Sequence, residues 1–164
     1  NKDLRDIGSG NIGATNALRT GNKTLGAVTL LLDGVKAYIA VAITFIYFLD
    51  YIYLSALLCI LGHIFPVWLR FKGGKGIAVF LGILFGFSIK LAILFMVCWG
   101  LILYLTKYSS VSSLVSTGVI FLYSIYLNNF PGSIFFFIIL IIVIYSHRVN
   151  IVRLRNKTEN KINF

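Results

Sequence analysis

The chain has 164 residues, of which 59% are hydrophobic and only 12% charged, whereas a typical soluble domain has about 25% charged residues. Its mean hydropathy of +0.91 leaves too little polar surface to coat a water-soluble globule. The net charge of +10 is also seen in nucleic-acid-binding proteins, but here the basic residues lie at the ends of apolar segments, as orientation by cytoplasmic Lys and Arg requires. We therefore expect an all-α, polytopic transmembrane helix bundle that does not bind nucleic acid.

The first polar segment, residues 8–19, mixes glycines with short polar side chains and ends on Arg19. The short side chains belong to Ser9, Asn11, Thr15 and Asn16. They suit hydrogen bonding to a polyol or a phosphate, and an arginine can bind two phosphate oxygens at once. The same residue types are also common in turns and caps, so both interpretations stay open. Ser9 does not lie in a Gly-x-Ser-x-Gly elbow, which argues against a serine hydrolase.

A membrane-spanning helix needs about 20 apolar residues, and the sequence contains long apolar stretches of that kind. They are Ala27–Phe48, Tyr51–Leu69, Ile77–Thr106, Val111–Leu127 and Ile134–Ser146. The third stretch is too long for one helix. If it forms two short helices that turn near residues 86–88, every strongly basic segment lies on one side of the membrane, as the positive-inside rule favours.

This argument predicts six spans, with both ends of this chain on the cytoplasmic side. Residues 1–26 are polar and so lack the apolar core of a signal peptide. Because the chain also has no initiator Met, we expect a seventh helix upstream of it. Residues 1–164 are expected to form a single transmembrane domain.

A few polar side chains interrupt the expected spans. Asp33 and Lys36 are one turn apart, so they most simply neutralise each other, although a place in a polar cavity stays open. His63 lies deeper, next to Pro66, and is expected to satisfy backbone groups freed by the proline. Neither histidine of the chain has a partner at metal-ligand spacing, and the cysteines lie in apolar runs, so we expect no metal and no other cofactor.

The second polar segment, Phe71-Lys72-Gly73-Gly74-Lys75-Gly76, is rich in glycine and lysine. Glycines let a backbone approach a ligand closely and aim N–H groups at it, and a lysine adds a point charge. The combination suits a phosphate at the start of the helix expected from Ile77, although its spacing differs from that of a Walker A loop. A basic turn that anchors to anionic lipid is the alternative.

The third polar segment, His147-Arg148-Val149-Asn150, comes at the end of the last span. His147 and Asn150 are spaced to share one helix face. A histidine there can act as an acid or base near neutral pH, or simply as an interfacial anchor. Carboxylates are scarce near the three polar segments, where Asp3, Asp6 and Glu159 are the nearest. A face so rich in cations is expected to bind an anionic ligand.

Three motifs therefore follow one another along the chain: Gly8–Asn16 with Arg19, Gly62–Pro66 leading into Phe71–Gly76, and His147-Arg148 with Asn150. Together they resemble the bacterial acyl-phosphate:glycerol-3-phosphate acyltransferase family over nearly the whole chain. The resemblance implies a seven-helix membrane bundle. One departure is visible, because the family's tail has Gly-Thr-Glu where this chain has Lys157-Thr158-Glu159. The glutamate is kept and the glycine is not.

The resemblance implies an acyltransferase that moves a fatty acyl group from acyl phosphate to the 1-hydroxyl of glycerol 3-phosphate. The products are lysophosphatidic acid and phosphate, in phospholipid biosynthesis. It also implies a multi-pass protein of the bacterial cytoplasmic (inner) membrane, with its active site facing the cytoplasm. Acyl phosphate, glycerol 3-phosphate, membrane lipid and a soluble enzyme that supplies acyl phosphate are the expected partners.

These expectations lead to a hypothesis for the site. The N–H groups of the glycine-rich segment and Lys75 hold one phosphate, Arg19 holds the other or bridges both, and His147 is either a base or an orienting group. The expected catalytic residues are Ser9, His147 and Asn150, and the expected substrate-binding residues are Asn11, Arg19, Lys72, Gly73, Gly74, Lys75 and Gly76.

Two other classes of function compete with this one. A carrier or channel for a small anion predicts discontinuous helices in the middle of the membrane and a cavity open to both sides. Here the glycine-rich segment is expected at one membrane face, so transport is the second hypothesis. A non-catalytic membrane scaffold leaves the polar segments without a role.

Overall fold

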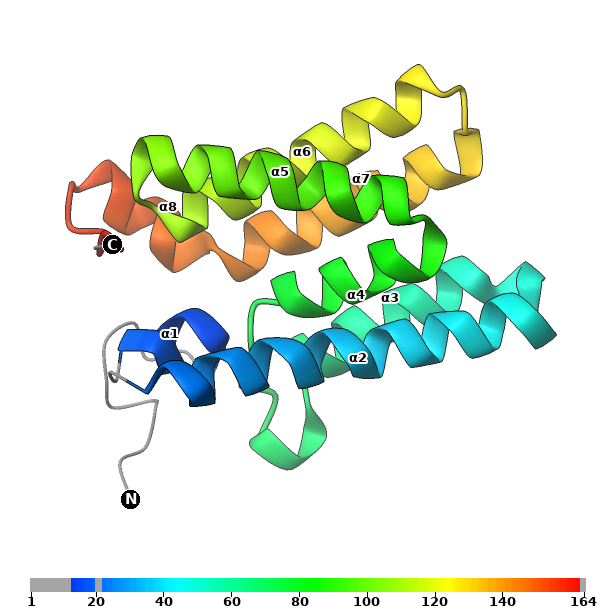
Figure 1. The fold of residues 1–164 in the computed structure, drawn as a ribbon, viewed down its shortest axis with the longest axis horizontal. Coiled ribbons are helices and arrows are strands. Elements are labelled where there is room, and N and C mark those ends of the chain that lie inside the picture. The colour runs from blue at the N-terminus through cyan, green and yellow to red at the C-terminus, as the bar shows by residue number, and fades with distance from the viewer. Residues whose placement is uncertain (1–12, 20–21, 163–164) are drawn as a thin grey trace. The chain divides into compact units, whose positions relative to one another are not determined.

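The computed structural model describes residues 13–19 and 22–162, and within these residues it contains helices and no strands (Figure 1). The α-helices are α1 (Ala14–Arg19), α2 (Lys23–Tyr47), α3 (Ile52–Ile64), α4 (Ile77–Phe87), α5 (Ile89–Thr106), α6 (Ser109–Tyr126), α7 (Phe130–Ser146) and α8 (Arg148–Arg155). Short 3-10 turns, Leu49–Tyr51 and Val67–Leu69, flank α3. The predicted all-α fold is confirmed.

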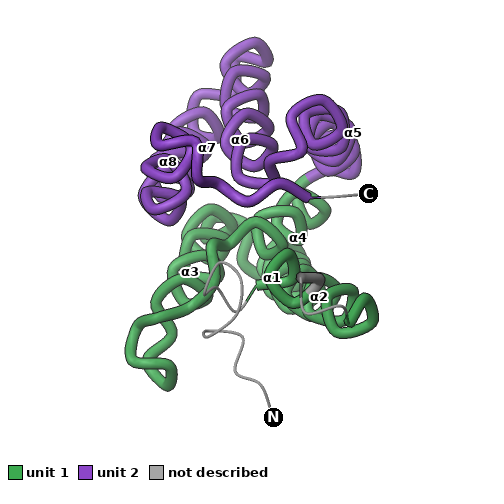
Figure 2. Tube along the Cα trace, turned by 90° about the vertical axis from the view of Figure 1, so that its left-hand side faces the viewer, with its two compact units in different colours: residues 1–87 green, residues 88–164 purple. Residues whose placement is uncertain are grey.

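The chain divides into two compact units, residues 1–87 and 88–164, which Figure 2 colours green and purple. We describe each unit by itself, and the expectation of a single domain stays a prediction. In the first unit α2 packs against α1, α3 and α4. The contact between α2 and α4 is close because it is made by glycines: a Cβ at Gly82 would collide with the carbonyl oxygen of Gly34. Small residues commonly allow such approaches between membrane helices.

In the second unit α6 packs against both α5 and α7. Its buried face carries hydroxyl side chains, among them Ser112, Ser113, Ser116, Thr117 and Ser124. Several of them hydrogen-bond back to the carbonyl four residues earlier in the helix, as Thr117 does to Ser113 at 2.8 Å. Ser113 also accepts a bond of 3.1 Å from the indole N–H of Trp99 on α5. The hydroxyls of Ser112, Ser113 and Thr117 are therefore satisfied within the helix, whereas that of Ser116 is buried without a hydrogen-bond partner among the described residues; the small side chains leave a narrow face for helix packing.

The break predicted inside Ile77–Thr106 is confirmed. The helix α4 ends at Phe87 and α5 begins at Ile89. Between them, the side chain of Ser88 caps α5 by accepting a bond of 3.3 Å from the N–H of Lys90. Hydroxyl side chains are among the preferred N-caps, because they satisfy a donor that the helix leaves open.

The six helices α2 to α7 fall on the six predicted spans, and the number of them that crosses the membrane stays a prediction. Among the described residues, four helical segments are long and apolar enough to cross a membrane, and a fifth is obtained if α7 and α8, bent by 60°, form one broken span. The helix α4 has 11 residues and is therefore about 16 Å long, roughly half the thickness of the hydrocarbon core. The side of the membrane on which each end of the chain lies stays a prediction.

Candidate functional site

The glycine-rich segment folds back onto the end of α3. The N–H of Gly73 donates to the carbonyl of Ile64 at 3.0 Å, and the N–H of Gly74 donates to the carbonyl of His63 at 3.2 Å. Side chains at these positions would not fit: a Cβ at Gly73 would collide with the carbonyl of His63, and one at Gly74 would collide with the His63 ring. Glycine is needed here because the loop lies directly against the helix.

These hydrogen bonds give the two glycines a structural role. Their N–H groups, which were expected to bind phosphate, donate to main-chain carbonyls and hold the loop in place. The substrate-binding role predicted for Gly73 and Gly74 stays a prediction. Gly76 has a positive φ of 83° and ends the loop just before α4. The lysines flank this anchored core, with Lys72 exposed and Lys75 half-buried, so they are the groups of the loop that suit an anionic ligand.

A polar cluster formed by Asp33, Lys36 and His63 lies beside this loop in the first unit. The ammonium of Lys36 is 2.6 Å from Oδ1 of Asp33, which confirms that the two charges neutralise each other. The same ammonium is 3.0 Å from Nδ1 of His63, and Asp33 Oδ1 is 3.5 Å from that nitrogen. The role predicted for the His63 ring is therefore corrected, because the ring pairs with side chains of α2 rather than with backbone near Pro66.

In the second unit the third polar segment is buried where α7 bends into α8. His147 is 2% exposed, which argues against an interfacial anchor. Its Nδ1 is 2.9 Å from the carbonyl oxygen of Val143 and 3.1 Å from the hydroxyl of Ser146. A carbonyl can only accept, so Nδ1 carries the proton and the lone pair of the neutral ring is on Nε2.

Asn150 is 5% exposed and belongs to a cluster built around Glu159. Its amide donates to Oε1 of Glu159 at 2.6 Å, and the hydroxyl of Ser110 donates to the same oxygen at 2.9 Å. The other oxygen, Oε2, is buried without a hydrogen-bond partner in the described part of the chain. In the sequence, Glu159 was noted only as the glutamate that this chain shares with the tail of the family it resembles. Its place as a single carboxylate in a basic tail could have predicted that it has polar partners elsewhere in the chain.

The first polar segment is described only in part. Ser9 and Asn11 lie outside the described residues, and Arg19 is described only as the last backbone position of α1. Asn16 is 2% exposed on α1, which packs against α2. The roles of Ser9, Asn11 and Arg19 stay predictions, as does the expectation that all three polar segments share one pocket.

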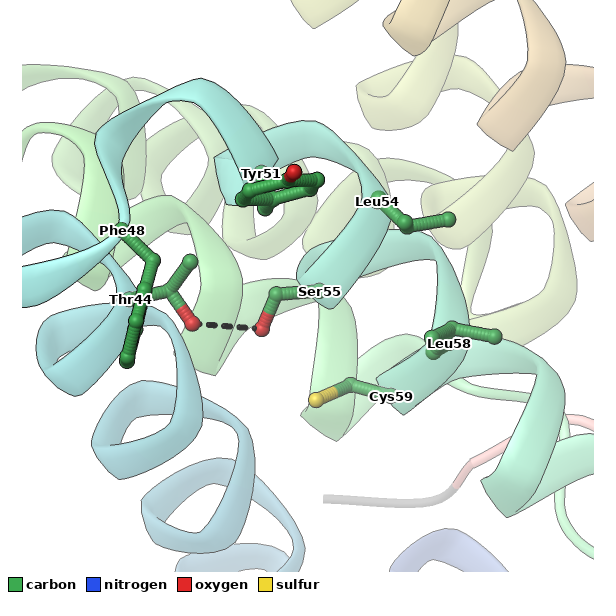
Figure 3. Close-up of a pocket in the computed structure, with 7 residues that line it drawn as sticks. All are labelled: Thr44, Phe48, Tyr51, Leu54, Ser55, Leu58 and Cys59. Carbon is green, nitrogen blue, oxygen red and sulfur yellow. Dashed lines mark hydrogen bonds between the residues drawn. The ribbon is translucent and has the colours of Figure 1, made fainter.

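A groove of about 520 Å³ lies between α2 and α3. It is lined by Thr44, Phe48, Tyr51, Leu54, Ser55, Leu58 and Cys59 (Figure 3). The hydroxyl of Thr44 donates to that of Ser55 at 2.9 Å, so these two hydroxyls bind each other. None of the predicted site residues whose side chains the structure describes lines it. Within the described residues, no group of three or more His, Cys, Asp or Glu side chains is arranged to hold a metal ion.

Comparison with known proteins places the chain in a family. A family model described as glycerol-3-phosphate acyltransferase matches residues 1–157. The glycerol-3-phosphate acyltransferase of Pelagibacter ubique is 52% identical over 160 residues, which cover 98% of this chain and 83% of the relative. That of Brucella anthropi is 45% identical over 161 residues, covering 98% of this chain and 80% of the relative.

Two solved structures are similar as well. Both are of PlsY, an integral membrane glycerol 3-phosphate acyltransferase. The glycerol 3-phosphate form is 34% identical with a TM-score of 0.91, over 99% of this chain and 83% of that one. The lysophosphatidic acid form is 33% identical with a TM-score of 0.86, over 94% and 81%. The chain therefore belongs to the glycerol-3-phosphate acyltransferase family and is an all-α membrane enzyme.

Proposed function

We propose that this enzyme transfers a fatty acyl group from acyl phosphate to the 1-hydroxyl of glycerol 3-phosphate. The observation that supports this most directly is the likeness to PlsY over 99% of the chain, since PlsY was solved in a glycerol 3-phosphate form and a lysophosphatidic acid form. These are the acceptor and the product of such a transfer. The donor, acyl phosphate, is inferred from the motifs and from the cation-rich segments, which suit a reaction with a phosphate on both substrates.

In this proposal the polar segments form one pocket for two phosphates. Lys72 and Lys75 supply positive charge from a loop whose shape is set by Gly73, Gly74 and Gly76. Arg19 binds the second phosphate or bridges both, because a guanidinium can bind two oxygens at once. Asn11 and Ser9 orient the reacting groups. The acyl tail lies among the apolar helices. The pocket opens on the cytoplasmic side of the inner membrane, where a soluble enzyme delivers acyl phosphate.

The chemistry needs little help from the protein, because an acyl phosphate is an activated mixed anhydride. The 1-hydroxyl oxygen of glycerol 3-phosphate bonds to the acyl carbonyl carbon, and the bond from that carbon to the phosphate oxygen breaks. The leaving phosphate takes the hydroxyl proton, so the products are lysophosphatidic acid and inorganic phosphate. His147 and Asn150 orient the hydroxyl and the acyl carbonyl toward each other, and such positioning of reactants lowers the barrier to reaction. Glu159 keeps Asn150 in place through their bond of 2.6 Å.

The proposal is tested with purified protein in detergent, acyl phosphate and glycerol 3-phosphate, by following phosphate release and lysophosphatidic acid together. We expect both products in equal amounts. Lys75→Met should lower kcat/KM by about 10- to 100-fold, because a hydrogen bond to a charged group contributes about 1.5–3 kcal/mol. Lys90→Met, which removes a lysine at the start of α5, is the matched control and should leave kcat/KM unchanged. A folded wild-type protein that makes neither product would contradict the proposal and favour the transport of a small anion.

A further inference from the structure

One turn of α2 contacts both helices that flank the glycine-rich loop. Lys36 contacts His63 on α3, at 3.0 Å from Nδ1. Gly34 makes the close contact with Gly82 on α4. We infer that Asp33 and Lys36 are positioning residues, which hold the His63 ring and through it the loop that carries Lys75. The kinetic part of this inference rests on the proposed function, whereas its structural part does not.

Neutralisation of the Asp33 and Lys36 charges does not by itself explain why His63 joins them. Charged side chains within membrane spans are costly and are usually paired. Asp33 and Lys36 already satisfy this requirement with their contact of 2.6 Å. The His63 side chain nevertheless joins them, and it is only 10% exposed. A lysine ammonium can only donate, so Nδ1 of His63 accepts and the neutral ring carries its proton on Nε2. The contact with Lys36 therefore fixes both the tautomer and the orientation of the ring.

The His63 ring in turn contacts the loop. The edge of the ring that carries Nε2 lies against Gly74, where even a single added carbon would collide with it. The backbone carbonyl of His63 also accepts a hydrogen bond from the N–H of Gly74 at 3.2 Å. His63 thus contacts Gly74 with both its side chain and its main chain. Lys75 is the next residue, so any movement of the ring that disturbs Gly74 displaces the lysine proposed to bind phosphate.

The far end of the loop is held to the same turn of α2. The loop leads into α4 at Ile77, and a Cβ at Gly34 would lie 3.5 Å from the carbonyl oxygen of Ala78, one residue into that helix. Both ends of the loop therefore take their position from residues 33–36. A displacement of the loop would move Lys75 away from the phosphate that it is proposed to bind, so this arrangement bears on substrate binding without touching the substrate.

The decisive variant replaces the ion pair with apolar side chains of similar size, Asp33→Leu with Lys36→Met. Such replacements are often neutral or stabilising, so we expect a folded protein. If the pair positions the loop, hydrogen exchange at the amides of Gly73 and Gly74 becomes faster by about tenfold or more. Lys36→Arg as a single variant, which keeps both the donor and Asp33, should retain the protection of the wild type. If the pair is only structural, the folded double variant will keep the exchange rates of the wild type, and that result overturns the inference.

The control uses a second polar contact between the same two helices. Thr44 and Ser55 also join α2 to α3, by a bond of 2.9 Å that lies in the groove of Figure 3 and away from the loop. Thr44→Val should leave exchange at Gly73 and Gly74 unchanged. Equal acceleration in Thr44→Val and in the double variant would mean that any weakening of the interface loosens the loop, and would also overturn the inference.

The kinetic readout separates this inference from the proposed function. The double variant should raise KM for at least one phosphate substrate by about tenfold and lower kcat by less than about threefold, since the chemical groups are untouched. An unchanged KM together with faster exchange would contradict a role in substrate binding. A wild-type protein inactive with acyl phosphate would refute the proposed donor, while the exchange result would still decide the positioning role.

Discussion

The two units carry polar clusters of opposite character. In the first unit, Asp33, Lys36 and His63 form a set in which a carboxylate meets a cation at 2.6 Å. In the second, the carboxylate of Glu159 meets only neutral donors, from Asn150 and Ser110, and its Oε2 is buried without a partner in the described residues. The first cluster is electrically balanced and contacts a loop. The second places the negative charge of Glu159 beside the side-chain amide of Asn150 and holds that amide in position.

This difference indicates separate tasks for the two clusters. A balanced ion pair tolerates replacement by apolar side chains, whereas an isolated carboxylate with neutral donors does not. Changes in the first unit should therefore alter loop position and substrate binding. Changes in the second should alter folding and turnover. The following predictions test this contrast, from the largest expected effect to the smallest.

The largest effect is expected from Glu159→Ala. It leaves the buried amide of Asn150 and the hydroxyl of Ser110 without their acceptor, and each lost bond to a charged group costs about 1.5 kcal/mol or more. We expect a loss of about 3 kcal/mol in the free energy of unfolding, measured by denaturation in detergent. Glu159→Gln keeps an acceptor oxygen and should lose less than half as much. Equal losses in both variants would show that the charge, and not the acceptor, holds Asn150.

His147→Ala should lower kcat by about 100-fold, as expected for a group that acts on the reaction, and, because the ring is buried and hydrogen-bonded, it should also lower the free energy of unfolding by about 1–3 kcal/mol. The pH–rate profile then distinguishes its roles. If His147 orients the substrates, the profile keeps its shape with a lower plateau. Loss of the rise in rate with increasing pH would instead identify His147 as the general base.

Gly74→Ala should raise KM about tenfold, because the added carbon pushes against the His63 ring and displaces the loop by a fraction of an ångström or more. Gly100→Ala is the matched control, since no described atom lies within 4 Å of a Cβ there. Steady-state kinetics of the two variants provide the comparison. If both leave KM unchanged, the loop does not bind substrate.

The smallest effect is expected from Thr44→Val. Its hydroxyl bonds to Ser55 at 2.9 Å, and hydrogen bonds between membrane helices contribute about 0.6 kcal/mol on average. Thermal unfolding in detergent should show a loss of that size, with kcat and KM unchanged. A changed KM would mean that any weakening of the α2–α3 interface reaches the loop, and would contradict a specific role for Asp33 and Lys36.

Much of the fold was predictable because apolar length and charge bias are properties of the sequence alone. The break between α4 and α5 followed from the placement of basic residues, and the pairing of Asp33 with Lys36 followed from their spacing on one helix. The helix α4 begins at Ile77, as the sequence predicted, but it has only 11 residues, so hydropathy alone does not decide how many of the helices cross the membrane.

The site was less predictable, because its decisive contacts join residues far apart in the sequence. His63 meets Lys36 across 27 positions, and Ser110 meets Glu159 across 49. No local pattern predicts such pairs. The glycines of the loop were predicted to bind phosphate, whereas the role that the structure shows for Gly73 and Gly74 is to let the loop pack against the end of α3. These contacts are not visible in the sequence, because the N–H groups of Gly73 and Gly74 donate to the carbonyls of Ile64 and His63, which lie about ten residues earlier, in the preceding helix.

The central claim is that acyl phosphate is the donor for acylation of glycerol 3-phosphate by this chain. The most direct test supplies purified protein with isotope-labelled glycerol 3-phosphate and, in parallel, with acyl phosphate or acyl-coenzyme A. We predict labelled lysophosphatidic acid with acyl phosphate and essentially none with the thioester. Product from acyl-coenzyme A alone would contradict the account.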